Sequence, residues 1–273
     1  MINFSKMHGL GNDFVVIDAI NQTFNLTAEK IRKLADRHYG VGFDQLLVVE
    51  QATGNADFRY VIYNADGSEV SQCGNGARCF ALFVTQKGLT DKRTIRVETG
   101  AGELVLNINT HNEVTVDMGQ PRFVPADIPL LATQQPLYQV NVDGSTIEFS
   151  ALSMGNPHAV IQVDDIETAA LQSVGVAMES HEVFPERANI GFSQITGVSS
   201  VALRVYERGA GETLACGSGA CAAAVAGIQL GKLTSPVSVS LAGGELQIDW
   251  QGGATSVMMT GPAEFVFDGM IEL

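Results

Sequence analysis

Two cysteines stand in the same short motif, Cys-Gly-x-Gly-Ala, once at residues 73–77 and once at residues 216–220. Each motif precedes an apolar stretch with helical spacing, which predicts that each thiol lies at the start of a helix. A helix start presents unpaired N–H groups and the positive end of the helix dipole, which can lower a thiol pKa and hold a carboxylate. Two such thiols would form a matched acid–base pair.

The other two cysteines, Cys79 and Cys221, lie within the expected helices and are interpreted as small buried side chains. The cysteine spacings lack the two-residue gaps of zinc knuckles, and the histidines show no metal-ligand spacing. The sequence therefore predicts no metal site. In a reducing compartment no stable disulfide is expected either, although two thiols that face one small cavity could oxidise to each other in air.

Similarity between the two halves of the chain extends beyond the cysteines. Aligning residues 63–81 with residues 206–224 matches Tyr63 with Tyr206 and Glu69 with Glu212. Two further matches are collinear with this one: Gly11-Asn12 with Gly155-Asn156, and Gly42-Phe43 with Gly191-Phe192. This pattern indicates two copies of one unit of roughly 120 residues, each with one reactive cysteine.

The elements that must position these thiols are short strands and a few helices. Helices are expected at residues 27–37, 76–87 and 219–230, the last rich in alanine and expected to be buried. Strand-like runs with Gly or Asn turns between several of them occur at residues 95–98, 104–106, 114–118, 138–142, 203–206, 237–241 and 246–250.

A cluster of prolines marks the expected connection between the halves. Four of the eight prolines fall at Pro121, Pro125, Pro129 and Pro136, which interrupts regular structure. The expected domains are residues 1–118 and 119–262, with residues 263–273 packing back on the first.

Composition favours a globular protein without a nucleic-acid or membrane partner. The 273 residues are 45% hydrophobic and 17% charged, enough to bury two domain-sized cores. The formal net charge of −14 and the lack of a Lys/Arg cluster disfavour binding to nucleic acid or an anionic membrane. The sequence contains neither a run of about 18 apolar residues nor a signal peptide, so a cytoplasmic location is expected.

Motifs in both halves together resemble diaminopimelate epimerases. The first half carries His8-Gly9-Leu10-Gly11-Asn12-Asp13-Phe14, then Asn64-Ala65-Asp66-Gly67-Ser68-Glu69 leading to Cys73-Gly74-Asn75-Gly76-Ala77-Arg78. The second half carries Gly155-Asn156-Pro157-His158, then Tyr206-Glu207-Arg208-Gly209-Ala210-Gly211-Glu212 leading to Cys216-Gly217-Ser218-Gly219. The resemblance spans the whole chain, with no departure at any motif position.

The resemblance implies an α/β fold of the α+β type with two pseudo-symmetric domains. Each domain would be a β-barrel-like sheet around a central helix, with the active site in the cleft between the domains. The implied reaction is the interconversion of L,L- and meso-diaminopimelate without a cofactor, late in lysine and peptidoglycan precursor synthesis. A homodimer is the family expectation.

Site residues follow from the same motifs. The resemblance implies that Cys73 and Cys216 are the two acid–base groups, with His158 and Glu207 tuning their pKa values. Glu69, Glu212, Asp13 and Asp66 are interpreted as structural, the two glutamates at the starts of the helices. Substrate-binding residues are expected at Asn12, Gln45, Asn64, Gly74, Asn75, Asn156, Asn189, Glu207, Arg208, Gly217 and Ser218.

Two alternatives stay open at this point. Another cysteine-pair racemase, acting on proline or hydroxyproline, would share the thiols but would not need the amides and the arginine suited to a second charged end. A non-enzymatic thiol redox or metal-binding module would need vicinal thiols or histidine ligands, which the sequence lacks.

Overall fold

The chain, described here as a computed structural model over residues 1–71 and 73–272, divides by its internal contacts into two compact units. Unit 1 is Met1–Asp117 with Thr260–Leu273, and unit 2 is Met118–Met259. The structure thus assigns Met118 and residues 260–262 differently from the sequence-based division. The proline-rich segment belongs to unit 2, because Ile128 and Leu130 are buried in the core of that unit.

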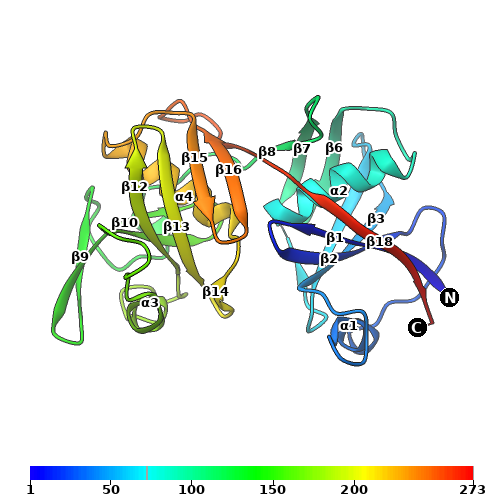
Figure 1. Cartoon of the computed structure of the whole chain (residues 1–273), viewed down its shortest axis with the longest axis horizontal. Coiled ribbons are helices and arrows are strands. Elements are labelled where there is room, and N and C mark those ends of the chain that lie inside the picture. The colour runs from blue at the N-terminus through cyan, green and yellow to red at the C-terminus, as the bar shows by residue number, and fades with distance from the viewer. Residues whose placement is uncertain (72, 273) are drawn as a thin grey trace. The chain divides into compact units, whose positions relative to one another are not determined.

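Unit 1 is a mixed sheet that curves around one helix, α2 (Gly74–Gln86) (Figure 1). Strand pairing runs in the order β18, β1, β2, β3, β4, β6, β7, β8, with β5 beside β4. The strands are β1 (Ile2–Gly9), β2 (Asn12–Asp18), β3 (Gln45–Gln51), β4 (Phe58–Asn64), β5 (Glu69–Val70), β6 (Thr94–Thr99), β7 (Gly102–Ile108), β8 (Val114–Asp117) and β18 (Glu264–Ile271), while β17 (Met258–Gly261) spans the second division of the chain.

Strands β2 and β3 of unit 1 are buried on both faces because a helix covers each face. Phe14 of β2 and Leu47 of β3 face α2, where both lie near Gly76. On the other face, Val15 packs with Ile31 and Leu34 of the amphipathic helix α1 (Ala28–Ala35). Such continuous apolar runs are typical of strands buried on two sides, and β2 and β3 are indeed parallel.

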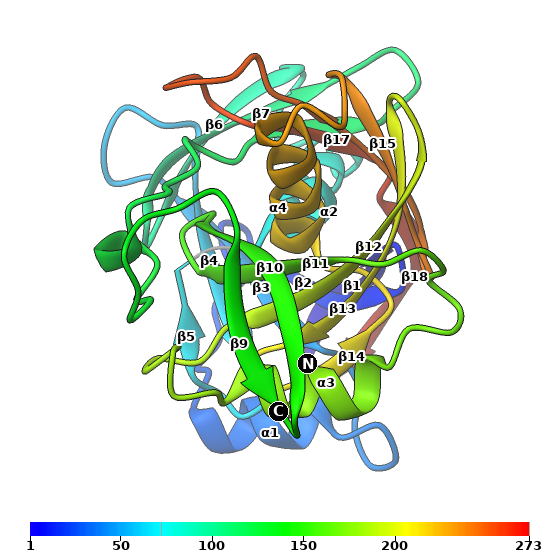
Figure 2. The same ribbon diagram turned by 90° about the vertical axis from the view of Figure 1, so that its left-hand side faces the viewer.

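Unit 2 repeats this arrangement around α4 (Gly217–Gln229). Strand pairing runs β9, β10, β11, β12, β13, β15, β16, with β14 beside β13. Figure 2, which looks onto unit 2, shows α4 inside the curve of the sheet and α3 (Leu171–Glu179) outside it. The strands are β9 (Tyr138–Val142), β10 (Ser145–Ser153), β11 (Pro157–Gln162), β12 (Asn189–Gly197), β13 (Ser200–Glu207), β14 (Gly211–Thr213), β15 (Val237–Leu241) and β16 (Gly244–Asp249), preceded by a 3₁₀ turn at Pro125–Asp127.

The strand register corrects one part of the sequence-based repeat. In unit 1, Gln45 pairs with Asn64, and in unit 2 Asn189 is the residue of β12 that lies beside His158 of β11, as Gln45 lies beside Phe14. Gln45 therefore matches Asn189, at the same spacing as Asn12 and Asn156. The match of Gly42-Phe43 with Gly191-Phe192 is wrong, because the first pair precedes β3 whereas the second lies inside β12.

Three predicted helices are confirmed, with one systematic difference at their starts. Both cysteine-linked helices begin two residues earlier than predicted, because Cys73 and Cys216 themselves cap them. Helix α1 begins directly after its cap, Thr27, whose hydroxyl accepts from the Lys30 N–H at 3.3 Å. Glu69 and Glu212 do not start helices, since they lie on the short strands β5 and β14, opposite Tyr63 and Tyr206.

Candidate active site

The two motif cysteines have the same local geometry. Cys73 is extended, with φ −149°, and its Sγ accepts a hydrogen bond from the Gly76 N–H at 3.3 Å. Cys216 is extended, with φ −119°, and its Sγ accepts from the Gly219 N–H at 3.4 Å. A thiol in this capping position receives one of the unpaired N–H groups of the helix, an interaction that stabilises a thiolate more than a thiol. Each unit thus contains one thiol at the positive end of its central helix.

The surroundings of Cys216 oppose this stabilisation. Its side chain is buried, with 4% exposed, whereas Cys73 is half-buried. Burial, followed by the negative charge of Glu207, raises the pKa of Cys216 well above its ordinary value, although Ser218 and the Gly219 N–H act in the opposite direction. Cys216 therefore carries its proton at neutral pH.

In unit 1 the predicted binding residues gather where β2 and β3 begin and β4 ends. The Gln45 Nε2 donates to Asn64 Oδ1 at 3.0 Å, and the Asn64 Nδ2 donates to the Ser68 hydroxyl at 3.1 Å. The Asn75 Nδ2, in the first turn of α2, donates to Asn12 Oδ1 at 3.3 Å. The structure therefore joins these predicted residues in two amide pairs.

One acceptor in this group is unsatisfied. Among the described residues, the buried Gln45 Oε1 has no hydrogen-bond partner. A buried acceptor left without a donor costs roughly 1–3 kcal/mol, so this atom suits a ligand that brings an N–H group.

In unit 2 the predicted residues form two sets of hydrogen bonds, one around Asn156 and one around Asn189, which the backbone of residues 156–158 connects. The Asn156 Nδ2 donates to the Ser218 hydroxyl at 3.3 Å, and the Asn156 Oδ1 lies 3.0 Å from the His158 Nε2. The Asn189 Nδ2 donates to the Pro157 carbonyl at 3.1 Å, and its Oδ1 accepts from the Arg208 N–H at 3.0 Å. These contacts link the ends of β11, β12 and β13 to the first turn of α4, which Gly217 begins.

His158 is an uncharged member of the set around Asn156. Burial, followed by the positive charge of Arg208, lowers the pKa of His158 to about 3. An imidazole that faces the Asn156 oxygen through Nε2 must hold its proton on that nitrogen. The neutral ring thus orients Asn156 as a hydrogen-bond donor and offers no positive charge to a thiolate.

The sequence gives no sign of Glu179, a buried carboxylate that holds two of the loops in unit 2. Its Oε1 accepts from the Gly209 N–H at 2.9 Å and lies 3.6 Å from the Arg187 Nη1, while its carbonyl accepts from the Ala188 N–H. It ends α3, where the helix dipole disfavours a carboxylate. These contacts fix the segments next to Asn189 and Arg208.

Gly76 permits the close packing beneath the first thiol. A Cβ at this position would lie 2.3 Å from the Tyr60 Oη, and Tyr60 is buried and donates to the Cys73 carbonyl at 3.4 Å. In an open helix Gly→Ala stabilises by about 1 kcal/mol. Here we expect Gly76→Ala to destabilise by about 1–3 kcal/mol, because the ring must move.

Thermal unfolding of Gly76→Ala measures this effect, together with the rate of the reaction proposed below. Replacing Tyr60 by phenylalanine in the same chain removes the clashing oxygen and should restore most of the lost melting temperature. A single variant as stable as the wild type would show that this packing does not constrain the turn.

Two negative findings apply to the described part of the chain. Within residues 1–71 and 73–272, no three His, Cys, Asp or Glu side chains are grouped as a metal site requires. No helix in the same ranges is long and apolar enough to cross a membrane.

Comparison with known proteins identifies close relatives. The chain matches the Diaminopimelate epimerase family over residues 4–124 and 150–266. It is 56% identical over 273 residues to the diaminopimelate epimerase of Nitrosospira multiformis and 57% identical to that of Nitrosomonas europaea, covering 100% of this chain and 99% of each relative.

Solved structures with lower identity share the fold. A hydroxyproline epimerase from Agrobacterium vitis, with bound trans-4-hydroxy-L-proline, has a TM-score of 0.70 at 15% identity, covering 98% of this chain and 91% of that one. A phenazine biosynthesis protein of the PhzF family from Bacillus anthracis has a TM-score of 0.69 at 16% identity, covering 100% and 99%. The predicted two-domain α+β fold is therefore confirmed.

Proposed function

Since this chain belongs to the diaminopimelate epimerase family, we propose that it interconverts L,L- and meso-2,6-diaminopimelate by a two-base mechanism. The observation that carries the mechanism is the matched pair of capping thiols, one in each unit. Inverting one carbon requires a base on one face of the carbon and an acid on the other. Cys73 and Cys216 supply these two groups.

The protonation state of Cys216 supports a division of labour. Because burial and Glu207 favour the protonated form of Cys216, we assign this thiol as the acid of the resting enzyme, which leaves Cys73 as the base. In the reverse direction the roles exchange, and the Glu207 carboxylate accepts the proton that Cys216 must then give up. Glu207 is held by the Thr213 hydroxyl, which donates to its Oε1.

Removal of an α-proton leaves negative charge on the reacting carboxylate. The family reaction needs no cofactor, so fixed hydrogen bonds and helix dipoles must stabilise this charge. The first-turn N–H groups of both helices, from Gly74, Asn75, Gly217 and Ser218, suit this carboxylate.

The distal end of diaminopimelate carries a second ammonium and a second carboxylate. Gln45, whose Oε1 has no donor within the described part of the chain, suits the ammonium, and the guanidinium of Arg208 suits the carboxylate. The carboxamides of Asn12, Asn64, Asn156 and Asn189 complete the proposed site. The substrate of a proline or hydroxyproline racemase has no second charged end that could bind to these groups.

The function is tested by proton NMR of L,L-diaminopimelate in D₂O with the reduced protein. We expect the α-proton signal to fall as the meso isomer appears, with deuterium at the inverted carbon. If the protein exchanges only proline or hydroxyproline, the substrate is wrong although the two-thiol chemistry stands. Absence of any exchange would contradict the proposal.

The assembly state follows from the family expectation. We propose a homodimer in the cytoplasm. Sedimentation of the purified protein tests the first statement, because a dimer would have twice the chain mass of 29.0 kDa.

A further inference from the structure

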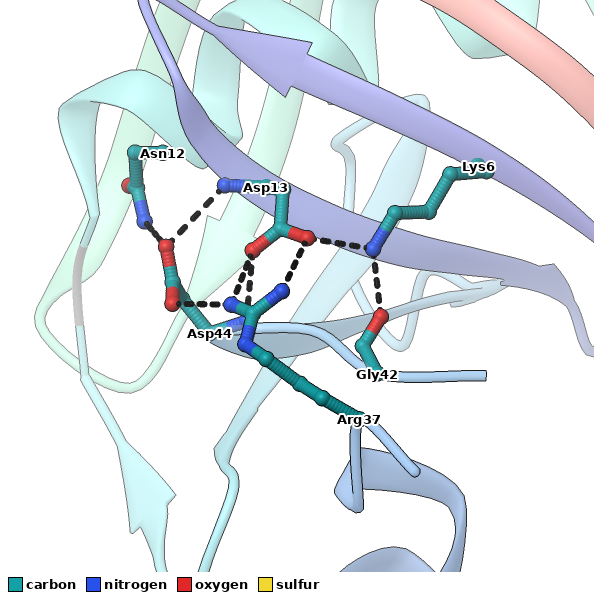
Figure 3. Close-up of polar contacts among 6 residues, drawn as sticks. All are labelled: Lys6, Asn12, Asp13, Arg37, Gly42 and Asp44. Carbon is teal, nitrogen blue, oxygen red and sulfur yellow. Dashed lines mark hydrogen bonds and ion pairs between the residues drawn. The ribbon is translucent and has the colours of Figure 1, made fainter. Parts of the chain in front are cut away.

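A network of charged side chains lies beside the first thiol-bearing helix in unit 1 (Figure 3). The Asp13 carboxylate accepts from Arg37 Nη1 at 3.0 Å and Nη2 at 2.8 Å, and from the Lys6 ammonium. The Arg37 Nη2 also donates to Asp44 Oδ1 at 2.7 Å. One guanidinium thus holds two carboxylates that come from different segments of the chain.

The second oxygen of Asp44 faces a proposed substrate-binding residue. Asp44 Oδ2 accepts from the Asn12 Nδ2 at 2.8 Å and from the Asp13 N–H at 3.1 Å. A carboxylate only accepts hydrogen bonds, so the Asn12 carboxamide must turn its nitrogen toward Asp44. Its oxygen then faces the Asn75 Nδ2 at 3.3 Å. The orientation of Asn12 is therefore set by Asp44 and passed on to the first turn of α2.

Contacts within unit 1 hold the network in place. Lys6 donates to the Gly42 carbonyl as well as to Asp13, and a Cβ on Gly42, whose φ is +74°, would lie 2.9 Å from the Arg37 Cγ. The loop thus closes tightly around the stem of Arg37. Ion pairs with half-exposed partners contribute little stability, and the Arg37 and Asp44 side chains are 55% and 44% exposed. Stability alone is therefore a weak reason for the Arg37–Asp44 pair.

We propose that Asp44, held by Arg37, is a positioning residue that fixes the Asn12 carboxamide in the orientation that binds diaminopimelate. The inference rests on the proposed function, because it takes Asn12 as a substrate-binding residue. In this orientation Asn12 directs one N–H to Asp44 and its oxygen to Asn75, and it retains a second N–H as a donor for an acceptor oxygen of the substrate.

Two substitutions of Asp44 separate positioning from simple loss of charge. In Asp44→Asn, Arg37 can donate only to the amide oxygen, so the new NH₂ group turns toward Asn12. Asn12 must then reverse and present its own NH₂ group to that of Asn75. In Asp44→Ala, Asn12 loses a partner but can still adopt the binding orientation. Asp44→Asn should therefore raise KM more than Asp44→Ala.

The experiment compares kcat, KM and melting temperature for Asp44→Asn and Asp44→Ala, alone and combined with Asn12→Ala. We expect KM for L,L-diaminopimelate to rise about tenfold in Asp44→Asn, equal to about 1.4 kcal/mol, and about threefold in Asp44→Ala. In both variants kcat should change less than about threefold. In the Asn12→Ala background neither substitution should change KM more than about twofold, because coupled residues are non-additive.

Glu50→Gln is the matched control, since it breaks the exposed Arg59–Glu50 pair of unit 1 and should leave KM unchanged. If Asp44→Ala raises KM as much as Asp44→Asn, or if either effect persists without Asn12, the inference is overturned. Should Asp44→Asn fail to fold, Arg37→Met serves instead, with a rise in KM that must again vanish without Asn12. A wild-type protein that does not epimerise diaminopimelate would refute the proposed function itself. The comparisons between variants are made in an active enzyme and test only the role of Asp44.

Discussion

Cys73→Ala and Cys216→Ala should each lower the rate of diaminopimelate epimerisation roughly 10³-fold. A positioned acid or base contributes about 10²–10⁴ to a rate, and inversion needs both groups in one turnover. Each thiol caps the central helix of its own unit, so neither can replace the other. Conversion of L,L- to meso-diaminopimelate, followed by NMR, measures the loss.

Proton exchange in D₂O distinguishes the two variants. A single remaining thiol can still remove an α-proton and return deuterium to the same face. Each variant should therefore exchange the α-proton of the reacting carbon in one configuration, L or D, without inverting it. The two variants should act on opposite configurations. Exchange of the same configuration by both variants would contradict the assignment of one thiol to each face.

Cys79 and Cys221 provide matched controls on the same two helices. Both side chains are fully buried. Alanine at either position should leave epimerisation within about twofold and cost about 1 kcal/mol of stability, because it removes only a small buried group. Loss of activity in Cys79→Ala as severe as in Cys73→Ala would make the motif position irrelevant.

The position of each thiol at a helix start is predictable because the residues that determine it are contiguous in the sequence. The capping cysteine, the glycines and the apolar stretch that form each helix start are contiguous, and the repetition of the motif supports the assignment. The starts of α2 and α4 differ from the prediction by two residues because cysteine is not a common capping residue. The false match of Gly42 with Gly191 has a similar cause, since two residues cannot fix a register that strand pairing determines.

Other features were beyond a reading of local patterns. Helix α3 has a glycine, Gly175, at its centre, and its first residue follows Ala170, which provides no side-chain cap. Glu179, at the end of that helix, was therefore not identified. The network joins Lys6 of β1 and Asp13 of β2 to Arg37 and Asp44, which lie between α1 and β3, and no spacing in the sequence predicts that arrangement.

Glu207→Gln should move the alkaline limb of the pH–rate profile to lower pH, and it should reduce kcat roughly 10²-fold in the direction in which Cys216 is the base. When Cys216 acts as the acid, it must be protonated, so activity is lost as the pH rises through the pKa of this thiol. The Glu207 charge is, after burial, the cause that raises this pKa. Removing the charge lowers the pKa, and protonated Cys216 is then lost at a lower pH. The loss in kcat follows because glutamine cannot accept the proton that Cys216 gives up in the opposite role.

The dependence of kcat/KM on pH, followed upward from the ordinary thiol pKa of about 8.5, measures the limb. Alkylation of Cys216 by iodoacetamide reports its thiolate directly. Alkylation should be faster in Glu207→Gln than in the wild type at the same pH, even though epimerisation in the direction that uses Cys216 as the base is slower. Glu212→Gln is the control, because this residue lies on β14, 40% exposed and paired with Arg204 at 2.8 Å. A limb that stays in place or moves to higher pH would show that Glu207 does not hold the proton on Cys216.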